Sequence, residues 1–520
     1  MSSTPPPGLF ATDLPVDAVV FAPPAVVTPA TPEPTSAPRP TPGARRLVDA
    51  LARIGVAAHV LAPRRQGDGP QSDAEALGHH LASAGLGPDR LTLIGADAIV
   101  PGTSRARTLI VTSCPEMATG MSGAGHPVLI VEQGPVHEVV LRWLAGRVGH
   151  FAAAAALVAP PDRGAADATR SRQLRLTKPA GSLGRLEDLG AHLAAVAGAC
   201  PPPLPHPAAT AVFVGDHGVH AQGVSPWPQQ VTTQMVANFL AGGAAVNVLA
   251  RHVGSDVVVV DVGMVDDIVL STTAPTDTPT GVLTDGPTDA LSAPQLIRRK
   301  VRRGTADLST GPAMTPDEAR RALDVGAEVA ALLVAGGARC LITGDMGIAN
   351  TTASAALIAS LTDRPATAVT GRGTGIDDQL LTRKTALVAA AAARARYEHG
   401  SDALAVLAEV GGLEHAALAG FVVGAAALHV PVIVDGVIAA ASLLVASRLA
   451  PGVEECVIAG HRSVEPGASA VLDALGLVPV IDLGLRLGEG TGAVLALPLV
   501  EAAARVLREM ATFDEAGMTD

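Results

Sequence analysis

The chain has 520 residues, of which 48% are hydrophobic and only 2% aromatic, and its formal net charge is −12. Its length predicts two to four domains at ~150 residues each, with cores of Ala, Val and Leu packed around many glycines. The negative charge and the lack of a basic stripe exclude a nucleic-acid or anionic-membrane partner. Four scattered cysteines without metal-ligand spacing, and no secretory signal, predict a cytoplasmic protein.

The first part of the chain alternates between apolar runs and helical patterns. Residues 1–15 are rich in Pro, Ser and Thr and are predicted to be disordered. Residues 16–158 are predicted to form a separate small α/β domain. Strands are expected at 16–27, 56–61, 91–94, 108–112 and 127–131, and helices at 45–54 and 73–84.

The segment 16–28 resembles the opening strand of the haloacid-dehalogenase-type phosphatases. In that family two aspartates follow this strand as nucleophile and acid/base, and the matching positions here are Ala22 and Pro24. The hydroxyl position of the family's second strand is Ala62. Without a carboxylate nucleophile no phospho-aspartyl intermediate can form. The resemblance implies an inactive module, and a generic α/β appendage is the alternative.

The second part follows a predicted linker at 159–173. Residues 174–515 carry short glycine-rich motifs at strand and helix ends, with a Thr/Pro/Asp-rich surface insert at 266–292. The apolar segment 416–434 raises the question of a membrane span. It contains His429 and Pro431, and Asp435 follows at once, so a buried helix followed by a buried strand explains it better.

Two features follow the strand expected at 211–214. Asp216 and His217 could form an acid/base pair, but their flanking glycines suit a structural turn equally well. Next comes a group with an aromatic face, a thioether and hydrogen-bonding side chains, namely Ser225, Trp227, Gln234 and Met235. Such a mixture suits a flat heteroaromatic ligand, with core packing as the alternative.

Two glycine-rich turns predict a site for a phosphate and a ribose. The segment 341–352 reads as a strand, a turn and a helix start, where free backbone N–H groups favour an anion. The segment 371–378 repeats this design, and Lys384 is expected two turns into the next helix. The residues assigned to this site are Gly347, Asn350, Thr351, Gly373, Thr374, Gly375 and Lys384.

The stretch 485–493, Leu-Arg-Leu-Gly-Glu-Gly-Thr-Gly-Ala, holds one carboxylate between glycines. A strand-like run at 477–483 precedes it and a helical run at 493–510 follows. Glycines allow a sharp turn and a close approach to a ligand. An acid at the carboxyl end of a strand is where an α/β protein places chemistry, so Glu489 is the leading catalytic candidate.

Taken in order, seven motifs resemble the nicotinate-nucleotide:dimethylbenzimidazole phosphoribosyltransferase family. They are Thr-Lys-Pro-x-Gly-Ser-Leu-Gly, Asp-His-Gly-Val, Gly-Val-Ser, Met-Gly-Ile-x-Asn-Thr-Thr, Gly-Arg-Gly-Thr-Gly, Val-Asp-Gly and Leu-Gly-Glu-Gly-Thr-Gly. The resemblance covers residues 174–515. It implies a Rossmann-like parallel sheet, a smaller helical domain built from both ends of this region, and a homodimer.

The resemblance also implies an activity. The family transfers ribose 5-phosphate from nicotinate mononucleotide to 5,6-dimethylbenzimidazole in cobalamin lower-ligand assembly, giving α-ribazole phosphate and nicotinate. Its catalytic glutamate corresponds to Glu489, and Leu487 joins the predicted base pocket. A second acid, normally glutamate, is Asp345 here, and Ala349 replaces a glycine. Neither a cofactor nor a metal ion is expected.

The chemistry agrees with these residues. Nicotinate bound through its ring nitrogen is already cationic and leaves without an acid, whereas the incoming benzimidazole must lose one proton. One carboxylate suffices for that proton. A non-catalytic nucleotide- or benzimidazole-binding protein of the same fold is the alternative. A Rossmann dehydrogenase ranks last, because no Gly-x-Gly-x-x-Gly turn with a suitably spaced acid is present.

Overall fold

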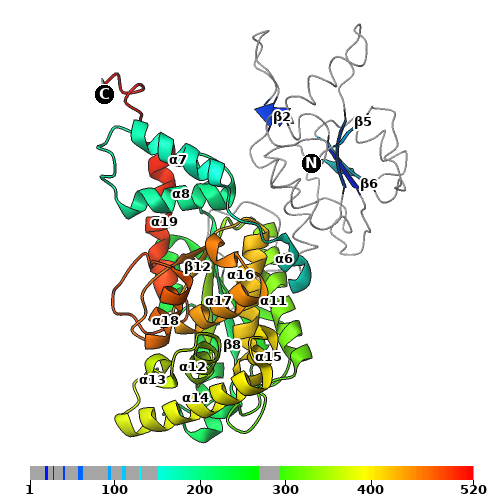
Figure 1. Ribbon diagram of the computed structural model, residues 1–520, viewed down its shortest axis with the longest axis vertical. Helices are drawn as coiled ribbons and strands as arrows, with labels where there is room; N and C mark the ends of the chain where they lie inside the picture. The colour runs from blue at the N-terminus through cyan, green and yellow to red at the C-terminus, as the bar shows by residue number, and fades with distance from the viewer. Residues whose placement is uncertain are drawn as a thin grey trace, which may run out of the picture.

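The computed structural model describes residues 150–268 and 293–518, together with seven short strands between residues 18 and 130 (Figure 1). Several predictions fall outside these residues. They are the disordered segment 1–15, the helices at 45–54 and 73–84, the positions Ala22, Pro24 and Ala62, and all but the first three residues of the insert at 266–292.

Five of the early strands form one parallel sheet in the order β5-β4-β1-β6-β7. The first strand in sequence is therefore central, as in doubly wound α/β folds. The expected strands at 56–61, 91–94, 108–112 and 127–131 are confirmed. The expected strand at 16–27 is divided, because β2 pairs with β3 in a separate sheet. The strands are β1 (Ala18–Phe21), β2 (Val27–Thr28), β3 (Arg39–Pro40), β4 (Ala57–Leu61), β5 (Thr92–Ile94), β6 (Thr108–Thr112) and β7 (Val128–Ile130).

The second sheet has six strands in the order β10-β9-β8-β11-β12-β13, and all neighbouring pairs are parallel. Counted from β8, this is the 3-2-1-4-5-6 order of a Rossmann-like sheet, and the order reverses between β8 and β11. The expected fold class is confirmed. The strands are β8 (Ala208–Gly215), β9 (Ser255–Gly263), β10 (Gln295–Arg298), β11 (Cys340–Met346), β12 (Val432–Val434) and β13 (Val457–Ala459).

Helices connect these strands and cover the sheet. They are α6 (Phe151–Leu157), α7 (Arg163–Arg175), α8 (Arg185–Ala197), η2 (Gly218–Gln222), α9 (Val231–Leu240), α10 (Ala245–Val253), α11 (Pro316–Ala335), α12 (Asn350–Leu361), α13 (Ala366–Val369), α14 (Asp378–His399), α15 (Ala403–Val410), α16 (Leu413–Ala427), α17 (Val437–Leu449), η3 (Val453–Cys456), α18 (Pro466–Leu475) and α19 (Thr491–Glu509).

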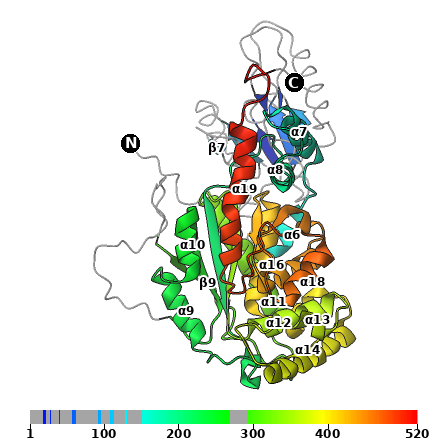
Figure 2. The ribbon, with the colours of Figure 1, turned by 90° about the vertical axis from the view of Figure 1, so that its left-hand side faces the viewer.

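The central strand β8 contributes to two cores, one on each face of the sheet. Ala211 and Phe213 pack into the core formed with α11, α12 and α14–α17, whereas Val212 and Val214 pack into the core formed with α10 and α19. Successive side chains of a strand point to opposite faces, which explains this division. Figure 2 shows α9 and α10 on one side of the sheet and α11 and α16 on the other.

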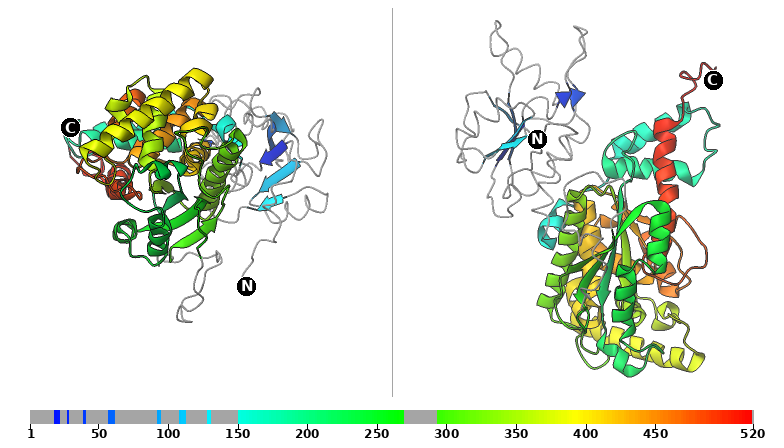
Figure 3. Two further views of the ribbon diagram at one scale, coloured as in Figure 1. Left: turned by 90° about the horizontal axis from the view of Figure 1, so that it is seen from below. Right: turned by 180° about the vertical axis from the view of Figure 1, so that it is seen from behind.

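A three-helix unit joins the two ends of the region. The helices α7 and α8 pack against the C-terminal helix α19 (Figure 3). Arg172 Nε donates to the Leu507 carbonyl oxygen at 2.6 Å, and the Phe513 N–H donates to the Arg175 carbonyl oxygen at 2.9 Å. The predicted helical domain is therefore confirmed. Helix α7 also occupies most of the predicted linker at 159–173 and begins at the capping residue Asp162.

The small side chains of the sequence allow α11 and α16 to touch through their backbones. A Cβ atom added at Gly420 would lie 1.9 Å from the Leu323 carbonyl oxygen, and one at Gly326 would lie 1.8 Å from the Ala417 carbonyl oxygen. Such distances are far below van der Waals contact. The two glycines therefore fix the spacing of this helix pair, which carries Glu414 in the first turn of α16.

Replacing Gly420 with alanine is expected to destabilise the protein by at least about 2 kcal/mol. Alanine normally favours a helix over glycine by about 1 kcal/mol, but overpacking costs about 1–3 kcal/mol or more, and here the obstacle is backbone. Denaturant unfolding measures the change. Gly311→Ala is the control, because no described atom lies within 4 Å of a Cβ at that position. An unchanged midpoint for Gly420→Ala would contradict the close packing.

The structure tests two predictions made for apolar segments. The predicted buried helix and strand at 416–434 are confirmed as α16 and β12. The predicted strand at 477–483 is wrong, because this segment is a loop that forms only one isolated bridge, between Ile481 and His461. Within the described part of the chain, one stretch, Val231–Val253, is long and apolar enough to cross a membrane, and it consists of α9 and α10.

Candidate active site

Glu489 lies in a strained turn over the carboxyl end of β11. Gly488, Glu489 and Gly490 have φ angles of 81°, 64° and 96°, three consecutive residues in the left-handed region. This conformation costs glutamate free energy, and such strain is typical of functional sites. Close contact enforces it, because a Cβ on Gly344 would lie 2.5 Å from the Glu489 carbonyl oxygen.

The Glu489 carboxylate is buried and has one hydrogen-bond donor among the described residues. Its Oε2 accepts from the Val246 N–H in the first turn of α10 at 3.3 Å. Burial raises the pKa of Glu489, the Val246 hydrogen bond opposes this, and the nearby charge of Asp435 adds to the rise. A carboxylate with a raised pKa is a better proton acceptor. The turn therefore presents a base close to the switch point of the sheet.

Asp435 follows β12 and holds the Glu489 turn in place. Its two carboxylate oxygens accept from the Gly490 N–H at 3.2 Å and the Ala493 N–H at 2.9 Å. His461 Nε2 lies 3.4 Å from Asp435 Oδ1. The sequence showed an acid directly after a buried strand, but it did not assign Asp435 a role, because its backbone partners at 490 and 493 lie far along the chain.

Asp345 is the penultimate residue of β11 and is almost completely buried. Its Oδ2 accepts from Asn350 Nδ2 at 3.0 Å. Burial, followed by the charges of Asp435, Glu414 and Glu489, raises the pKa of Asp345 well above its ordinary value. The two predicted catalytic acids therefore lie in the same carboxylate-rich region of the sheet edge.

Three of the predicted phosphate residues, Lys384, Thr351 and Gly373, come together. Lys384 lies two turns into α14, as expected, and its Nζ donates to Thr351 Oγ1 at 2.8 Å and to the Gly371 carbonyl oxygen at 3.2 Å. Desolvation lowers the pKa of the buried Lys384 to about 8. A Cβ on Gly373 would lie 3.1 Å from Thr351 Oγ1, so this loop lies over the start of α12.

The two predicted turns differ in one respect. Helix α12 begins without a side-chain cap, after Ala349 at φ 76°. The Asn350 and Thr352 N–H groups donate to the Gly347 and Ala349 carbonyl oxygens, but no carboxylate of the described residues competes with an anion at this helix start. Helix α14 is preceded by the short helix α13 rather than by a strand, and Asp377 caps its N-terminus. The expected repeat of the strand–turn–helix design is therefore wrong for 371–378. The start of α12 is the better anion site.

Glu465 was not predicted as a site residue. Its Oε1 accepts from the Gly373 N–H at 2.8 Å, and its charge partly offsets the fall in the Lys384 pKa. The sequence placed Glu465 at a helix end without assigning it a partner. Only the fold brings it to the loop, 92 residues away in the chain.

The predicted base pocket is partly assembled. Ser225 Oγ accepts from the Trp227 N–H at 3.3 Å, and Trp227 is 50% exposed. Gln234 is exposed on α9, whereas Met235 packs against the core on that side of the sheet. Leu487 is 59% exposed beside Glu489. No contact among the described residues joins all five, so the pocket stays a prediction.

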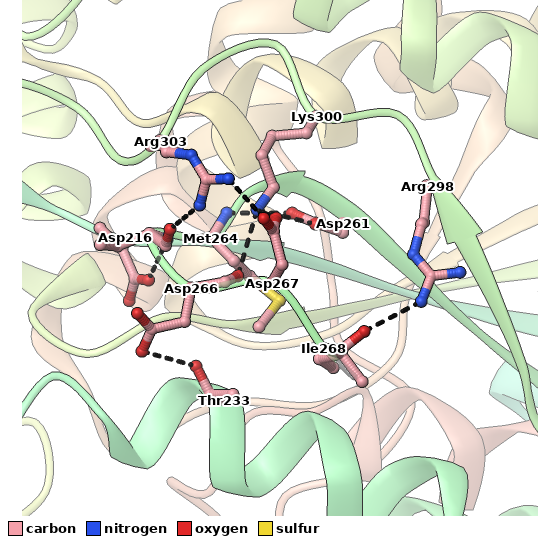
Figure 4. Close-up of polar contacts among 11 residues, drawn as sticks. Asp216, Thr233, Asp261, Met264, Asp266, Asp267, Ile268, Arg298, Lys300 and Arg303 are labelled. Carbon is pink, nitrogen blue, oxygen red and sulfur yellow. Dashed lines mark hydrogen bonds and ion pairs between the residues drawn. The ribbon is translucent and has the colours of Figure 1, made fainter. Parts of the chain in front are cut away.

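Helix α9 is nevertheless tied to the catalytic edge. Thr232 Oγ1 accepts from the Ile348 N–H at 3.2 Å, directly after β11. Figure 4 shows a polar cluster beside α9, where Thr233 contacts Asp266. The Val265 N–H donates to Asp216 Oδ2 at 2.8 Å. These contacts hold α9 beside the ends of β8, β9 and β11.

The centre of that cluster is Asp267, which pairs with two cations (Figure 4). Lys300 Nζ donates to Asp267 Oδ1 at 2.7 Å and lies 3.3 Å from Asp261 Oδ2, and Arg303 contacts Asp267 Oδ2. Hydrogen bonds from Lys300 and Arg303 lower the pKa of Asp267 to about 2. Because Asp267 is exposed, solvent screens its ion pairs with Lys300 and Arg303. These contacts fix the position of the chain after β9.

His217 is not free to act as a base. It is fully buried, and its Nε2 lies 2.8 Å from Glu414 Oε1, where His415 Nδ1 also lies at 2.7 Å. His415 Nε2 in turn lies 2.8 Å from Ser354 Oγ. Of the two interpretations of Asp216 and His217, the contacts favour the structural one.

The same three residues, His217, Glu414 and His415, offer a donor set that could hold a metal ion. Their nitrogen–oxygen separations of 2.8 Å and 2.7 Å are hydrogen-bond lengths. Ligand atoms that each lie about 2.1 Å from a tetrahedral zinc ion are further apart than this. The hydrogen bond between His217 and Glu414 and the close approach of His415 account for the geometry.

A cleft of about 600 Å³ lies away from this edge, between α8 and β13. Leu189 and His192 line one wall, and Val457 lines the other. None of the predicted site residues borders it. The catalytic candidates are therefore assigned by their convergence at the strand ends, not by the size of a cavity.

Comparison with known proteins agrees with this geometry. The sequence model of a family described as "Phosphoribosyltransferase" matches residues 158–518. A relative from Salinispora tropica named nicotinate-nucleotide–dimethylbenzimidazole phosphoribosyltransferase is 56% identical over 366 residues, or 70% of this chain and 97% of the relative. A protein of the same name from Chloroflexus aggregans is 51% identical over 363 residues, or 70% of this chain and 96% of that relative.

A solved structure shares the fold. The crystal structure of CobT from Thermus thermophilus is 47% identical, with a TM-score of 0.62, and the match covers 68% of this chain and 99% of that chain. The family match begins at residue 158, before the predicted boundary at 174. The chain therefore belongs to this phosphoribosyltransferase family.

Proposed function

We propose that the chain transfers ribose 5-phosphate from nicotinate mononucleotide to 5,6-dimethylbenzimidazole, giving α-ribazole 5′-phosphate and nicotinate, in cobalamin lower-ligand assembly. Relatives at 56% and 51% identity carry the name of this activity. The observation that carries the proposal is the Glu489 turn, which holds one buried carboxylate with a raised pKa at the edge where Asp345 lies near the end of β11 and Asp435 follows β12.

The reaction requires one proton acceptor. The ring nitrogen of nicotinate recovers its electron pair when the C1′–N bond breaks, so the leaving group needs no proton. One benzimidazole nitrogen attacks C1′, and the other loses its proton to Glu489. Attack on the face opposite the leaving group converts the β-glycosidic bond into an α bond. General base catalysis contributes about 10²–10⁴-fold, and alignment of the two rings across the ribose contributes much of the rest.

The contacts support a division of the site into two parts. Lys384, Thr351 and the uncapped start of α12 would bind the 5′-phosphate. Ser225, Trp227 and Leu487 would contact the base, with the α9 residues Gln234 and Met235 beside them. Assembly as a homodimer and a cytoplasmic location belong to the same proposal.

The direct test is a product-resolved assay of the full chain with nicotinate mononucleotide and dimethylbenzimidazole. We expect stoichiometric nicotinate and ribazole phosphate, with the α configuration at C1′ established by NMR. Heat-inactivated protein is the control. Calorimetric binding of both ligands without nicotinate release would favour the non-catalytic alternative and refute the proposal.

A further inference from the structure

Asp345 has one carboxyl oxygen that no described protein group satisfies. Its Oδ2 is occupied by Asn350 Nδ2, but its Oδ1 is buried and has no hydrogen-bond partner within residues 150–268 and 293–518. An ionised oxygen buried in this way would carry a large desolvation cost without compensation. A proton on Oδ1 removes the charge and turns the atom into a hydrogen-bond donor.

The charged groups around Asp345 are mainly anions. Asp435 faces it from the end of β12, Glu414 from the first turn of α16, and Glu489 from the catalytic turn. From α12 the neighbour is the neutral amide of Asn350. These carboxylates and burial together raise the pKa of Asp345, and the hydrogen bond from Asn350 opposes the rise.

Glu414 holds its charge better than Asp345 does. Glu414 accepts from His217 and lies against His415, and these imidazoles lower its pKa despite full burial. Asp435 accepts two backbone N–H bonds. Hydrogen bonds and opposite charges favour the ionised form of a carboxyl group. Asp345 has only the Asn350 amide among the described residues, so the cluster places its proton there.

We propose that Asp345 carries a proton on Oδ1 and donates it in a hydrogen bond to a hydroxyl oxygen of the bound ribose. Asp345 lies between the Glu489 turn and the start of α12, which are the predicted base side and phosphate side of the site. A Cβ on Gly488 would be 3.5 Å from Asp345 Oδ2, and Asn350 begins the predicted phosphate helix. The part of a nucleotide that lies between its base and its phosphate is the sugar. This inference rests on the proposed function.

The Asp345→Asn variant distinguishes two roles of Asp345, a protonated hydrogen-bond donor and an anion or second base. Asn retains one acceptor for the Asn350 amide and offers an N–H donor in place of the O–H. We expect kcat for Asp345→Asn within about threefold of wild type, and kcat/KM for Asp345→Ala reduced about tenfold to hundredfold. If Asp345 acted instead as an anion or as a second base, the asparagine variant would lose as much as the alanine variant.

The pH profile gives a readout that a structural role would not change. Wild-type kcat, measured at saturating nicotinate mononucleotide, should fall at alkaline pH as Asp345 loses its proton, and Asp345→Asn should lack this fall. Glu414→Gln removes a neighbouring negative charge and should move the alkaline limb to lower pH. Glu409→Gln is the matched control, because Glu409 is also buried but pairs with Arg394 and His399.

Analogues lacking one hydroxyl identify the acceptor. In wild type, either the 2′-deoxy or the 3′-deoxy nucleotide should lose about tenfold in kcat/KM. In the Asp345→Ala variant, the same missing hydroxyl should lower kcat/KM hardly any further. The effects of removing two groups that contact each other are not additive. Additive losses for both analogues would overturn the assignment to the ribose.

Infrared difference spectra provide a test that does not depend on turnover. Wild type minus Asp345→Asn should show the carbonyl band of a protonated carboxylic acid at about pH 7, and a carboxylate band there would refute the proposal. An inactive wild-type enzyme would refute the proposed function instead. Thermal unfolding of each variant establishes that it is folded.

Discussion

Replacing Glu489 with glutamine is expected to lower kcat about 10²–10⁴-fold, the range for loss of a general base. The amide oxygen can still accept from the Val246 N–H, and glutamine has the same backbone preference as glutamate at φ 64°. The variant therefore loses proton acceptance and little else. Steady-state release of α-ribazole phosphate measures the effect.

Stability should change in the opposite direction. Because burial raises the pKa of Glu489, its ionised form destabilises the folded state at pH values above that pKa. The neutral glutamine removes this cost, so the variant should unfold at a slightly higher temperature at about pH 7. Glu501→Gln on α19, where Glu501 pairs with the partly exposed Arg505, is the control. Near-normal turnover of Glu489→Gln would disprove the assignment.

The acid limb of the pH profile offers a second check on Glu489. The base must be ionised, so wild-type kcat/KM should fall as pH decreases through its raised pKa. The glutamine variant has no carboxyl group to titrate and should lack this limb. A limb that persists unchanged in the variant would assign it to another group.

Replacing Lys384 with methionine is expected to raise KM for nicotinate mononucleotide about tenfold to hundredfold while leaving KM for the benzimidazole nearly unchanged. Hydrogen bonds to charged groups contribute about 1.5–3 kcal/mol, and Lys384 is a buried cation beside the start of α12. Initial rates with each substrate varied in turn separate the two constants. An equal rise in both would argue against a phosphate contact.

The pH dependence of Lys384 has a definite sign. Because desolvation lowers its pKa to about 8, the free enzyme loses this charge as pH rises through about 8, and nucleotide affinity should fall there. The free energy of unfolding should change in the opposite direction and increase as pH rises. The unfolded chain binds more protons between about pH 8 and the ordinary lysine value, so folding becomes more favourable with rising pH. The methionine variant should show neither change.

Much of the fold was accessible from the sequence because buried parallel strands appear as uninterrupted apolar runs. Each of β8, β9, β11 and β12 ends in or is followed by a short polar motif, and these motifs located the catalytic edge. The carboxyl ends of parallel strands lie on one edge of a sheet, which brings Asp345 and Asp435 together, whereas the strand expected before Glu489 does not form.

The wrong predictions share one cause. The composition of a segment does not show which distant residues or strands it will contact. The run 477–483 is apolar enough for a strand, but Val478 and Leu483 are 63% and 62% exposed and no continuous ladder forms there with any described strand. The segment 159–173 resembled a linker because of its prolines, yet Asp162 caps α7. Residues such as Asp435, Glu414 and Glu465 act through contacts across the fold, which a single sequence cannot reveal.

Helix α6 shows that the start of the family match is not a boundary of folding. The family match begins at residue 158, after α6 has ended. Ala154 and Leu157 nevertheless belong to the main core, α6 packs on α11 and α16, and the Phe151 N–H donates to Asp324 at 2.8 Å. A fragment that begins at residue 158 would expose the apolar surface of α16, the helix that carries Glu414, on which α6 packs. A self-sufficient catalytic fragment has to start before α6.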